Sequence, residues 1–492
     1  MTSPLDTAEH PDKLRRIVIE PLSRVEGHGK VTILLDDQRK VHQVRLHIVE
    51  FRGFERFIQG RPYWEVPVMV QRLCGICPVS HHLAAAKALD QVVGAHELTA
   101  AAERIRRLMH YGQILQSHAL HFFHLASPDL LFGFGSDVGK RNVVGVLEAY
   151  PDIGRQGIML RKFGQEVIRI TAGKRVHGTG AIPGGMNKAV SARERDELLT
   201  PLPDVLSWAQ AGVRLVAELH RQNRTLYDDF GTVPSSLLSL VGRDGKLDLY
   251  DGVLRARDAD GAIIFDGVEC QDYGVQLREN VRSWSYMKFP FIVSRGAEHG
   301  WYKVGPLARI QNCDAIGTPL AEAARQELLE SAQGSLIHAP LAYHWARMIE
   351  LLHAAEVIQR LLADPELLSL DLIASGPRGR SGVGIIEAPR GTLIHHYEVD
   401  DRDLVTMCNL IVSTTHNNQA MNEAIRQVAR TYIDGHEPSE GLLNHIEVAI
   451  RAFDPCLSCA THALGKMPLA VEIVDASGNL VTRLVRDGEH LG

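Results

Sequence analysis

The chain has 492 residues, of which 45% are hydrophobic, and its 53 Lys and Arg against 59 Asp and Glu give a net charge of -6. This is the composition of an ordinary globular protein, and it leaves no basic footprint for nucleic acid. No run reaches the roughly 18 apolar residues that a membrane span needs, and residues 1–16 are polar, without the apolar core of a secretory signal. We therefore expect a soluble, cytoplasmic protein that binds neither nucleic acid nor membrane.

The first predicted elements along the chain are short strands followed by helices. Three segments with β-branched or alternating apolar residues predict a small antiparallel sheet: residues 17–20, 31–35 and 44–49. From residue 54 the pattern becomes helical, and Pro78 marks the first position of a helix that runs to about residue 93. Cys77 comes directly before this helix, where the positive end of the helix dipole favours a thiolate.

Most of the remaining chain is predicted to be helical. Apolar residues recur at helical spacing over residues 100–125, 142–170, 192–226, 320–332, 341–363, 417–432 and 440–453. Residues 235–310 differ, because Asp-Gly pairs separate short β-like runs there, which predicts a hairpin-rich excursion on one side of the helical body. Residues 469–474 and 480–485 predict a last hairpin. Together the elements indicate a mainly helical α+β fold.

Several histidines and cysteines are interpreted as residues without a chemical role, the histidines as surface or hydrogen-bonded core residues and the cysteines as core residues. The predicted helix over residues 100–125 contains four histidines, but no pair of them has the spacing of a known metal motif: His110, His118, His121 and His124. Three cysteines lie outside any pair and are typical of a core: Cys270, Cys313 and Cys408. Seven cysteines spread over a chain of this length do not indicate a disulfide framework.

The other four cysteines form two Cys-x-x-Cys pairs at opposite ends of the chain, Cys74 with Cys77 and Cys456 with Cys459. Two such turns can supply four soft ligands to one metal site. A structural zinc site is one interpretation, although zinc ribbons bring their pairs within about 15 to 20 residues of each other. A thioredoxin-like dithiol would need only one pair. A nickel, iron or iron–sulfur site is the third interpretation, and the spacing alone leaves all three open.

The residues that flank the pairs carry a family resemblance. The segments 72–77 (Arg-Leu-Cys-Gly-Ile-Cys) and 454–462 (Asp-Pro-Cys-Leu-Ser-Cys-Ala-Thr-His) resemble the two signature motifs of the [NiFe] hydrogenase large subunit. Three more segments resemble motifs of that family in the same order: 23–29 (Ser-Arg-Val-Glu-Gly-His-Gly), 51–55 (Phe-Arg-Gly-Phe-Glu) and 387–391 (Glu-Ala-Pro-Arg-Gly). The resemblance implies the fold of that subunit, with a central helix bundle and small peripheral β-sheets, and the reversible splitting of H2 into protons and electrons.

The resemblance also implies a set of metal ligands. All four thiolates would bind nickel, and an iron carrying carbon monoxide and cyanide would share Cys77 and Cys459, which leaves Cys74 and Cys456 as terminal nickel ligands. A terminal thiolate such as that of Cys456 would be the first base, and Glu26 would then carry the proton away. Without the resemblance, a Glu beside an Arg is usually a surface ion pair.

Three further residues are implied to act around the same centre. Arg390 resembles an arginine held over the vacant site, where its charge polarises the leaving proton or anchors a cyanide. Thr414 falls where the family donates a hydrogen bond to the other cyanide. Asp454 would orient the arginine or a thiolate, although an Asp-Pro pair is also a common helix end.

A second, hard-cation site is also implied. Glu55 and His462 match residues that the family uses for magnesium, completed by waters and a backbone carbonyl near Leu410. Two positions depart from well-known members, because Ser117 stands where many carry an Asp and His416 replaces a common Trp. These departures place the detailed proton network of those members in doubt for this chain.

The resemblance implies processing at the C-terminus. Large subunits of this kind are made as precursors, and an endopeptidase cuts after the histidine that follows the last cysteine, here His462. We therefore expect a single mature domain over residues 1–462 and a removable extension over residues 463–492, with chaperones that insert nickel and iron. The residues alone predict only an ordinary terminal hairpin.

Local sequence features point to one group of the family. Residues 284–290, 389–397 and 457–465 most resemble the bidirectional, NAD-reducing cytoplasmic hydrogenases. In that group electrons pass through iron–sulfur clusters on a small subunit to FMN and NAD on a diaphorase, which agrees with the lack of nucleotide motifs in this sequence. The alternatives are an NADP-linked or other cytoplasmic hydrogenase, a non-catalytic relative, and a zinc-scaffolded interaction protein.

Overall fold

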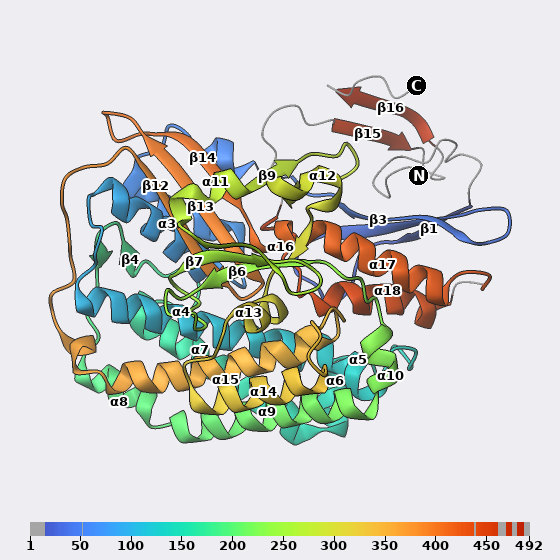
Figure 1. Ribbon diagram of the computed structural model, residues 1–492, viewed down its shortest axis with the longest axis horizontal. Helices are drawn as coiled ribbons and strands as arrows, with labels where there is room; N and C mark the ends of the chain where they lie inside the picture. The colour runs from blue at the N-terminus through green and yellow to red at the C-terminus, as the bar shows by residue number, and fades with distance from the viewer. Residues whose placement is uncertain (1–14, 52, 437–438, 461–468, 475–479, 487–492) are drawn as a thin grey trace.

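The computed structural model describes residues 15–51, 53–436, 439–460, 469–474 and 480–486. Long helices pack side by side and form the body of the molecule, with small sheets around them (Figure 1). These helices are α4 (Ala100–Leu120), α7 (Pro151–Ala172), α9 (Leu202–Gln222), α14 (Pro319–Ser331) and α15 (Ala342–Ala363). The arrangement confirms the predicted helical α+β fold.

Helix α15 lies at the centre of this body, in contact with α4, α9, α14 and the short helix α13 (Pro306–Asn312). Every residue from Ala342 to Ile358 is buried, because apolar residues occur all around the helix. Its buried polar groups therefore need partners inside the protein. The Glu350 carboxylate, for example, accepts hydrogen bonds of 2.7 and 2.6 Å from the Arg309 guanidinium.

Two three-stranded antiparallel sheets flank the helices. The first is the predicted N-terminal sheet, with β1 (Arg15–Ile19), β2 (Gly29–Leu35) and β3 (Val41–Ile48). The second has β12 (Ser381–Ala388), β13 (Gly391–Val399) and β14 (Val405–Ile411). In it, Ala388 pairs with Gly391, so a two-residue turn places Arg390 at the end of the β12–β13 hairpin. The shortest pair is β4 (Ala181–Ile182) with β5 (Gly185–Met186).

Residues 235–310 form hairpins, as predicted. The strands are β6 (Ser236–Val241), β7 (Val253–Arg257), β8 (Ile263–Val268), β9 (Leu277–Asn280) and β10 (Phe289–Ile292), with β11 (Tyr302–Lys303) parallel to β6. Leu238 and Leu254 from these hairpins share one apolar cluster with Ile385 of β12 and Ile394 of β13. The hairpins therefore pack onto the sheet that carries Arg390. The C-terminal strands β15 (Leu469–Val474) and β16 (Leu480–Arg486) also pair antiparallel, as predicted.

Several predicted helices are interrupted. Residues 142–170 form α6 (Val143–Ala149) and α7, because Pro151 disfavours the helical conformation at Tyr150. Residues 192–226 form α8 (Ala192–Leu199), α9 and α10 (Arg224–Asp229), with Pro201 between the first two. Helix α4 ends at Leu120 and continues as a π-helical segment, η4 (His121–Ala126).

The remaining helices match the sequence closely. Helices α14, α15, α17 (Asn418–Tyr432) and α18 (Glu440–Ala452) begin and end within one residue of the predicted bounds. The short helices are α1 (Phe54–Ile58), α2 (Val66–Met69), α5 (Ser127–Phe132), α11 (Tyr273–Gln276), α12 (Gly296–His299) and α16 (Ser413–His416). Within the part of the chain described, no helix is both long and apolar enough to cross a membrane.

Two glycines allow helix α3 (Pro78–Val92) to lie directly on strand β12. A Cβ atom on Gly382 would approach the carbonyl oxygen of Ala88 to 1.9 Å, and one on Gly384 would approach that of Ala84 to 2.1 Å. Without side chains at these positions, the backbones of helix and strand can touch. The N-terminus of α3, capped by Cys77, is thereby held beside the β12–β13 turn.

Replacing Gly384 with alanine is therefore expected to destabilise the fold. The added methyl group must push helix and strand apart, and overpacking of this kind costs about 1–3 kcal/mol. Differential scanning calorimetry should record a lower Tm. Gly135→Ala is the matched control, because Gly135 is exposed and a Cβ atom there meets no atom within 4 Å. Equal Tm values for the two variants would contradict the close approach.

Candidate metal centre

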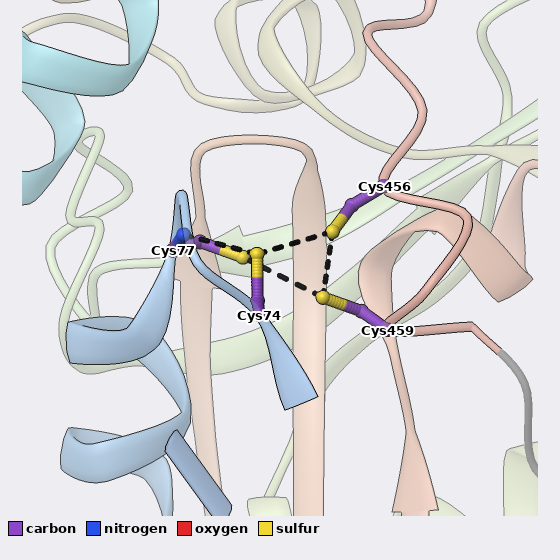
Figure 2. Close-up of side chains that lie close together, drawn as sticks. All are labelled: Cys74, Cys77, Cys456 and Cys459. Atoms are coloured by element: carbon purple, nitrogen blue, oxygen red, sulfur yellow. Dashed lines mark hydrogen bonds between the residues drawn. The ribbon is translucent and has the colours of Figure 1, made fainter. Parts of the chain in front are cut away.

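Four cysteine side chains from the two ends of the chain converge on one point (Figure 2). Their Sγ atoms all lie within 4.8 Å of one another. The Sγ atoms are 2.6 Å apart in Cys456 and Cys459, 3.2 Å apart in Cys74 and Cys456, and 3.8 Å apart in Cys77 and Cys459. All four side chains are buried, and none forms a disulfide. The predicted meeting of the two Cys-x-x-Cys pairs is confirmed, and such a group of sulfur atoms suits soft metal ions.

Local backbone structure explains why the thiols point inward. Cys74 follows the 3-10 turn η3 (Val70–Leu73), and its Sγ accepts hydrogen bonds from the backbone N–H groups of Ile76 and Cys77 at 3.2 and 3.1 Å. Cys77 is the N-cap residue of α3, as predicted. At the other end of the chain, α18 stops before Pro455, which cannot continue a helix, and the second pair follows in the loop.

The N-terminal segment 23–29 braces the second cysteine pair. Glu26 forms an isolated parallel bridge with Cys456, and its carbonyl accepts a 2.9 Å hydrogen bond from the N–H of Leu457. Gly27 has a φ of +83°, and a Cβ atom there would lie 2.6 Å from the backbone nitrogen of Ser458. Glycine is therefore required at this position of the motif, by conformation and by space.

Burial and mutual hydrogen bonds shift the pKa values of three of these thiols, those of Cys74, Cys456 and Cys459. Burial raises the pKa of the Cys456 and Cys459 thiols well above the ordinary value. Burial acts in the same direction at Cys74, but hydrogen bonds from the neighbouring thiols outweigh it and hold the pKa of Cys74 well below that value. Among these three thiols, Cys74 therefore loses its proton most readily. A bound cation would stabilise thiolates at this site, so metal binding should release protons.

A small cavity adjoins the sulfur atoms. It is lined by Cys77, Cys456 and Cys459 on one side and by groups of α3, the β12–β13 turn and α16 on the other: Ser80, His81, Ala388, Pro389, Arg390, Leu393, Val412, Ser413 and Thr414. Structural zinc sites are closed by their four ligands, whereas catalytic sites keep an open position. The cavity therefore favours a reactive centre over a structural one. Sequence reasoning missed His81, although it lies one helical turn after Cys77 and so on the same face of α3.

Arg390 reaches this cavity and is held by Asp454. Its Nε donates to the Asp454 carbonyl at 2.7 Å, and its Nη2 donates to Asp454 Oδ1 at 3.1 Å. Its Nη1 is buried with no hydrogen-bond partner among the described residues. An unsatisfied guanidinium N–H group beside a cavity suits an anionic or strongly polar ligand there. Burial raises the pKa of Asp454, while the charge of Arg390 lowers it.

Glu26 and Thr414 both contact Cys456. The Cys456 thiol donates to Glu26 Oε2 at 3.1 Å, and the same oxygen accepts from the Ser458 N–H at 3.1 Å. Glu26 is only half-buried, so it connects the sulfur cluster with the surface. The Thr414 hydroxyl accepts a 2.9 Å hydrogen bond from the Cys456 N–H, which leaves its own proton available to a group in the cavity.

Glu55 lies beside Leu410 in a separate cluster of charged groups. Its Oε1 accepts a 2.9 Å hydrogen bond from the Leu410 N–H, and its buried Oε2 has no partner within the described part of the chain. The Lys288 ammonium lies 3.5 Å from Glu55 and 3.0 Å from Glu279. Burial raises the pKa of both carboxyl groups, and Lys288 opposes the rise. Lys288 and Glu279 were missed because no sequence spacing relates them to Glu55. His462 lies outside the described residues.

The other residues singled out in the sequence lie in the interior. Ser117 is buried in α4, and the described residues offer its hydroxyl no partner. His416 Nδ1 is 2.6 Å from the Tyr302 hydroxyl. Of the histidines near α4, His110, His118 and His121 are buried and hydrogen-bonded, and His124 is half-buried. This agrees with their interpretation as surface or hydrogen-bonded core residues. The three single cysteines are buried in apolar clusters: Cys270, Cys313 and Cys408.

Comparisons with known proteins agree with this geometry. The family model of the nickel-dependent hydrogenases matches residues 52–131 and 254–462, and a model described as HoxL-like matches residues 16–51. The chain is 47% identical over 487 residues to the NAD-reducing hydrogenase HoxS subunit beta of Cupriavidus necator, covering 96% of this chain and 100% of that one. It is 45% identical over 417 residues to a chain of the F420-non-reducing hydrogenase vhu of Methanococcus voltae, covering 84% and 98%.

Solved structures extend the likeness to three dimensions. The crystal structure of an NAD+-reducing [NiFe]-hydrogenase in the H2-reduced state matches with a TM-score of 0.90 and 59% identity, covering 91% of this chain and 99% of that one. A [NiFeSe]-hydrogenase from Dm. baculatum has the same fold, with a TM-score of 0.74 at 22% identity and coverage of 91% and 100%. The chain therefore belongs to the nickel-dependent hydrogenase family, as a [NiFe] hydrogenase large subunit.

Proposed function

We propose that this chain is the hydrogen-activating subunit of a cytoplasmic hydrogenase that reversibly converts H2 into protons and electrons. The electrons would pass through an iron–sulfur small subunit to a diaphorase that carries FMN and reduces NAD. The observation that carries the proposal is the convergence of four buried thiols beside a cavity that also receives Arg390. The likeness to NAD-reducing hydrogenases over nearly the whole chain supports NAD as the acceptor.

The residues present fit a nickel–iron pair. Four thiolates are soft ligands that can hold such metals, and three of the four cysteines, Cys77, Cys456 and Cys459, line the cavity. The Nη1 of Arg390, which has no hydrogen-bond partner among the described residues, and the Thr414 hydroxyl would supply donors for cyanide on an iron bound there. When bound, the metal pair would supply the chemistry that splits H2 into two protons and two electrons.

The protein would then move the proton. The Cys456 sulfur is the proposed first base, and Glu26 Oε2, 3.1 Å away, is within reach to take the proton from it. Because Glu26 is half-buried, it can pass the proton outward. Arg390 keeps its positive charge at the cavity and is oriented by Asp454, so it can stabilise negative charge that develops there.

A magnesium ion would occupy the second site, held by Glu55, His462, waters and the backbone near Leu410. Two glutamates and one lysine leave this cluster with one net negative charge when all three are ionised, and Glu55 Oε2 is unpaired in the described structure. A hard divalent cation would offset the negative charge and would give Glu55 Oε2 a partner. The Lys288 ammonium would lie beside the magnesium ion, because its single charge does not neutralise both glutamates.

Metal insertion would come before cleavage of the C-terminal extension. Metal-insertion chaperones would load the site, and an endopeptidase would then cut after His462. The second cysteine pair lies at the end of the predicted mature domain, immediately before residues 463–492, and its thiols are buried. A late folding step that involves this segment would give the chaperones access to the thiols before they become enclosed.

Purification of the chain with its natural partners tests the proposal. We expect nickel and iron in the complex, co-purification of a diaphorase with an iron–sulfur subunit, and H2-driven reduction of NAD. A preference for NADP would support the alternative of an NADP-linked hydrogenase. Zinc without nickel or iron would support a scaffold protein. Retention of the four converging thiols argues against a non-catalytic relative.

A further inference from the structure

A second buried arginine, Arg309 of α13, contacts the turn that carries Arg390. Its guanidinium donates to the carbonyl oxygens of Ala388 and Pro389 at 2.6 and 3.4 Å. These are the two residues that come directly before Arg390. The Arg309 side chain is fully buried, but it does not line the metal cavity. The proposed function gives Arg309 no part.

All five N–H groups of the Arg309 guanidinium find an acceptor. Nε and Nη2 donate to the two carboxylate oxygens of Glu350 at 2.7 and 2.6 Å, and Nη1 donates to Glu387 Oε2 at 3.0 Å. The remaining two N–H groups donate to the carbonyls of Ala388 and Pro389. A guanidinium is planar and holds its five donors in a fixed fork. Because the two carboxylates fix that plane, the other two donors fix the backbone of the turn.

Other parts of the fold hold the two carboxylates in place. Glu350 lies on α15, in the stretch of that helix that is buried on all sides. Glu387 Oε1 accepts hydrogen bonds from the N–H of Leu240 at 2.7 Å and from the hydroxyl of Thr392 at 2.8 Å. Glu387 opens the motif of residues 387–391, but it does not line the metal cavity. Arg309 is thereby tied to the helical body through Glu350 and to strands β6 and β12 through Glu387.

The start of α13 lies against the same turn. Gly305 precedes the helix with a φ of +98°, and a Cβ atom there would lie 2.9 Å from the carbonyl oxygen of Arg390. Gly391 has a φ of +138°, and a Cβ atom there would lie 2.2 Å from Cγ2 of Val304. Both positions require glycine by conformation and by space. The helix therefore touches the turn with its backbone, and one helical turn later with the side chain of Arg309.

We propose that Arg309 is a positioning residue that fixes the backbone of residues 388–390 and, through it, the place of the Arg390 guanidinium at the metal cavity. Asp454 holds the head of the Arg390 side chain, and Arg309 holds the backbone from which that side chain starts. A misplacement of about 1 Å in a reacting site can cost about 10²-fold in rate. The inference rests on the proposed function, because it takes Arg390 to act at a metal centre.

Nuclear magnetic resonance of the full chain with 15N-labelled arginine tests the positioning before metal insertion. The Arg390 Nε–H signal is identified by its absence in Arg390→Lys. Arg309→Lys keeps the positive charge but loses the fork, because an ammonium carries three donors on one nitrogen. We expect the Arg390 Nε–H signal to shift and to exchange faster with water, since its bond to the Asp454 carbonyl loosens. An unchanged signal in folded Arg309→Lys would overturn the proposal.

Arg106→Lys is the matched control. Arg106 is also fully buried, and its guanidinium pairs with both carboxylate oxygens of Asp90 at 2.6 and 2.9 Å. It also donates to the backbone carbonyls of Ile182 and Gly185. The same change is therefore made in the same kind of environment, away from residues 388–390. The Arg390 signal should stay as in the wild type, and an equal change in both variants would point to general damage and overturn the proposal.

Glu350→Gln decides the question if Arg309→Lys does not fold. The glutamine keeps one oxygen acceptor for Arg309 and removes one of the two negative charges that the guanidinium contacts. Glu387 still balances the charge of Arg309, so the variant should fold. Glu350 does not contact the turn itself, and it acts on Arg390 through Arg309. We expect the Arg390 signal to change in the same direction as in Arg309→Lys and by less, and no change would count against the proposal.

The metal-loaded complex tests the consequence for the reaction. Arg309→Lys should retain nickel, slow the exchange of D2 with water about 10²-fold, and shift the infrared bands of cyanide on the iron. Unchanged bands together with an unchanged exchange rate would overturn the role of Arg309 in the reaction. A wild type without cyanide bands would contradict the proposed function instead, whereas the signal of the metal-free chain decides on Arg309 in either case.

Discussion

Replacing Cys77 with serine is expected to abolish hydrogen turnover. The Cys77 sulfur lines the cavity and lies 3.8 Å from that of Cys459, in the position proposed to be shared by both metals. A serine hydroxyl is a hard oxygen donor that remains protonated near neutral pH, so it is a poor ligand for metals that select soft sulfur. Hydrogen-dependent dye reduction and the nickel and iron content per chain should both fall to background in the purified complex.

Cys270→Ser provides the control for this experiment. Cys270 is also buried, and its thiol donates to the carbonyl oxygen of Gly252, a contact that a serine hydroxyl can keep. This variant should retain its metals and its activity. Dye reduction that survives in Cys77→Ser would contradict the assignment of the four thiols to the reactive centre.

The change Glu26→Gln should block proton exchange while the metals stay bound. The glutamine side chain can still accept a hydrogen bond from the Ser458 N–H, so the loop that carries Cys456 should keep its place. It cannot take up a proton from the sulfur at neutral pH. Loss of a general base lowers a rate by about 10²–10⁴-fold, and we expect a fall of this size in the exchange of D2 with water, measured by mass spectrometry.

Two variants accompany Glu26→Gln. Glu20→Gln changes an exposed carboxylate six residues before Glu26 and should leave exchange unchanged. Glu26→Asp keeps a carboxylate on a shorter side chain, so it should recover part of the rate. If Glu26→Gln exchanges D2 at the wild-type rate with a full complement of nickel, Glu26 does not belong to the proton path.

Sequence patterns such as apolar periodicity and turn residues predicted most of the secondary structure correctly. They failed at a proline inside a predicted helix and at contacts between distant segments. Apolar residues recur at helical spacing in the sequence of four helices, and this pattern predicted the bounds of α14, α15, α17 and α18. The continuous helix predicted over residues 142–170 was wrong, because periodicity gave too little weight to Pro151. The hairpins of residues 235–310 were predicted, but not that Leu238 and Leu254 would share a core with the β12–β13 hairpin. That contact joins segments far apart in the chain.

The kind of chemistry follows from short stretches of sequence, because two Cys-x-x-Cys pairs with their flanking residues specify soft ligands, and Pro78 and Pro455 place both pairs at helix ends. The folded structure was needed to show that the four thiols lie together, that Arg390 Nη1 has no hydrogen-bond partner among the described residues, and that Lys288 lies near two glutamates. Each of these facts depends on how distant segments pack, and packing distances are not encoded in any local pattern.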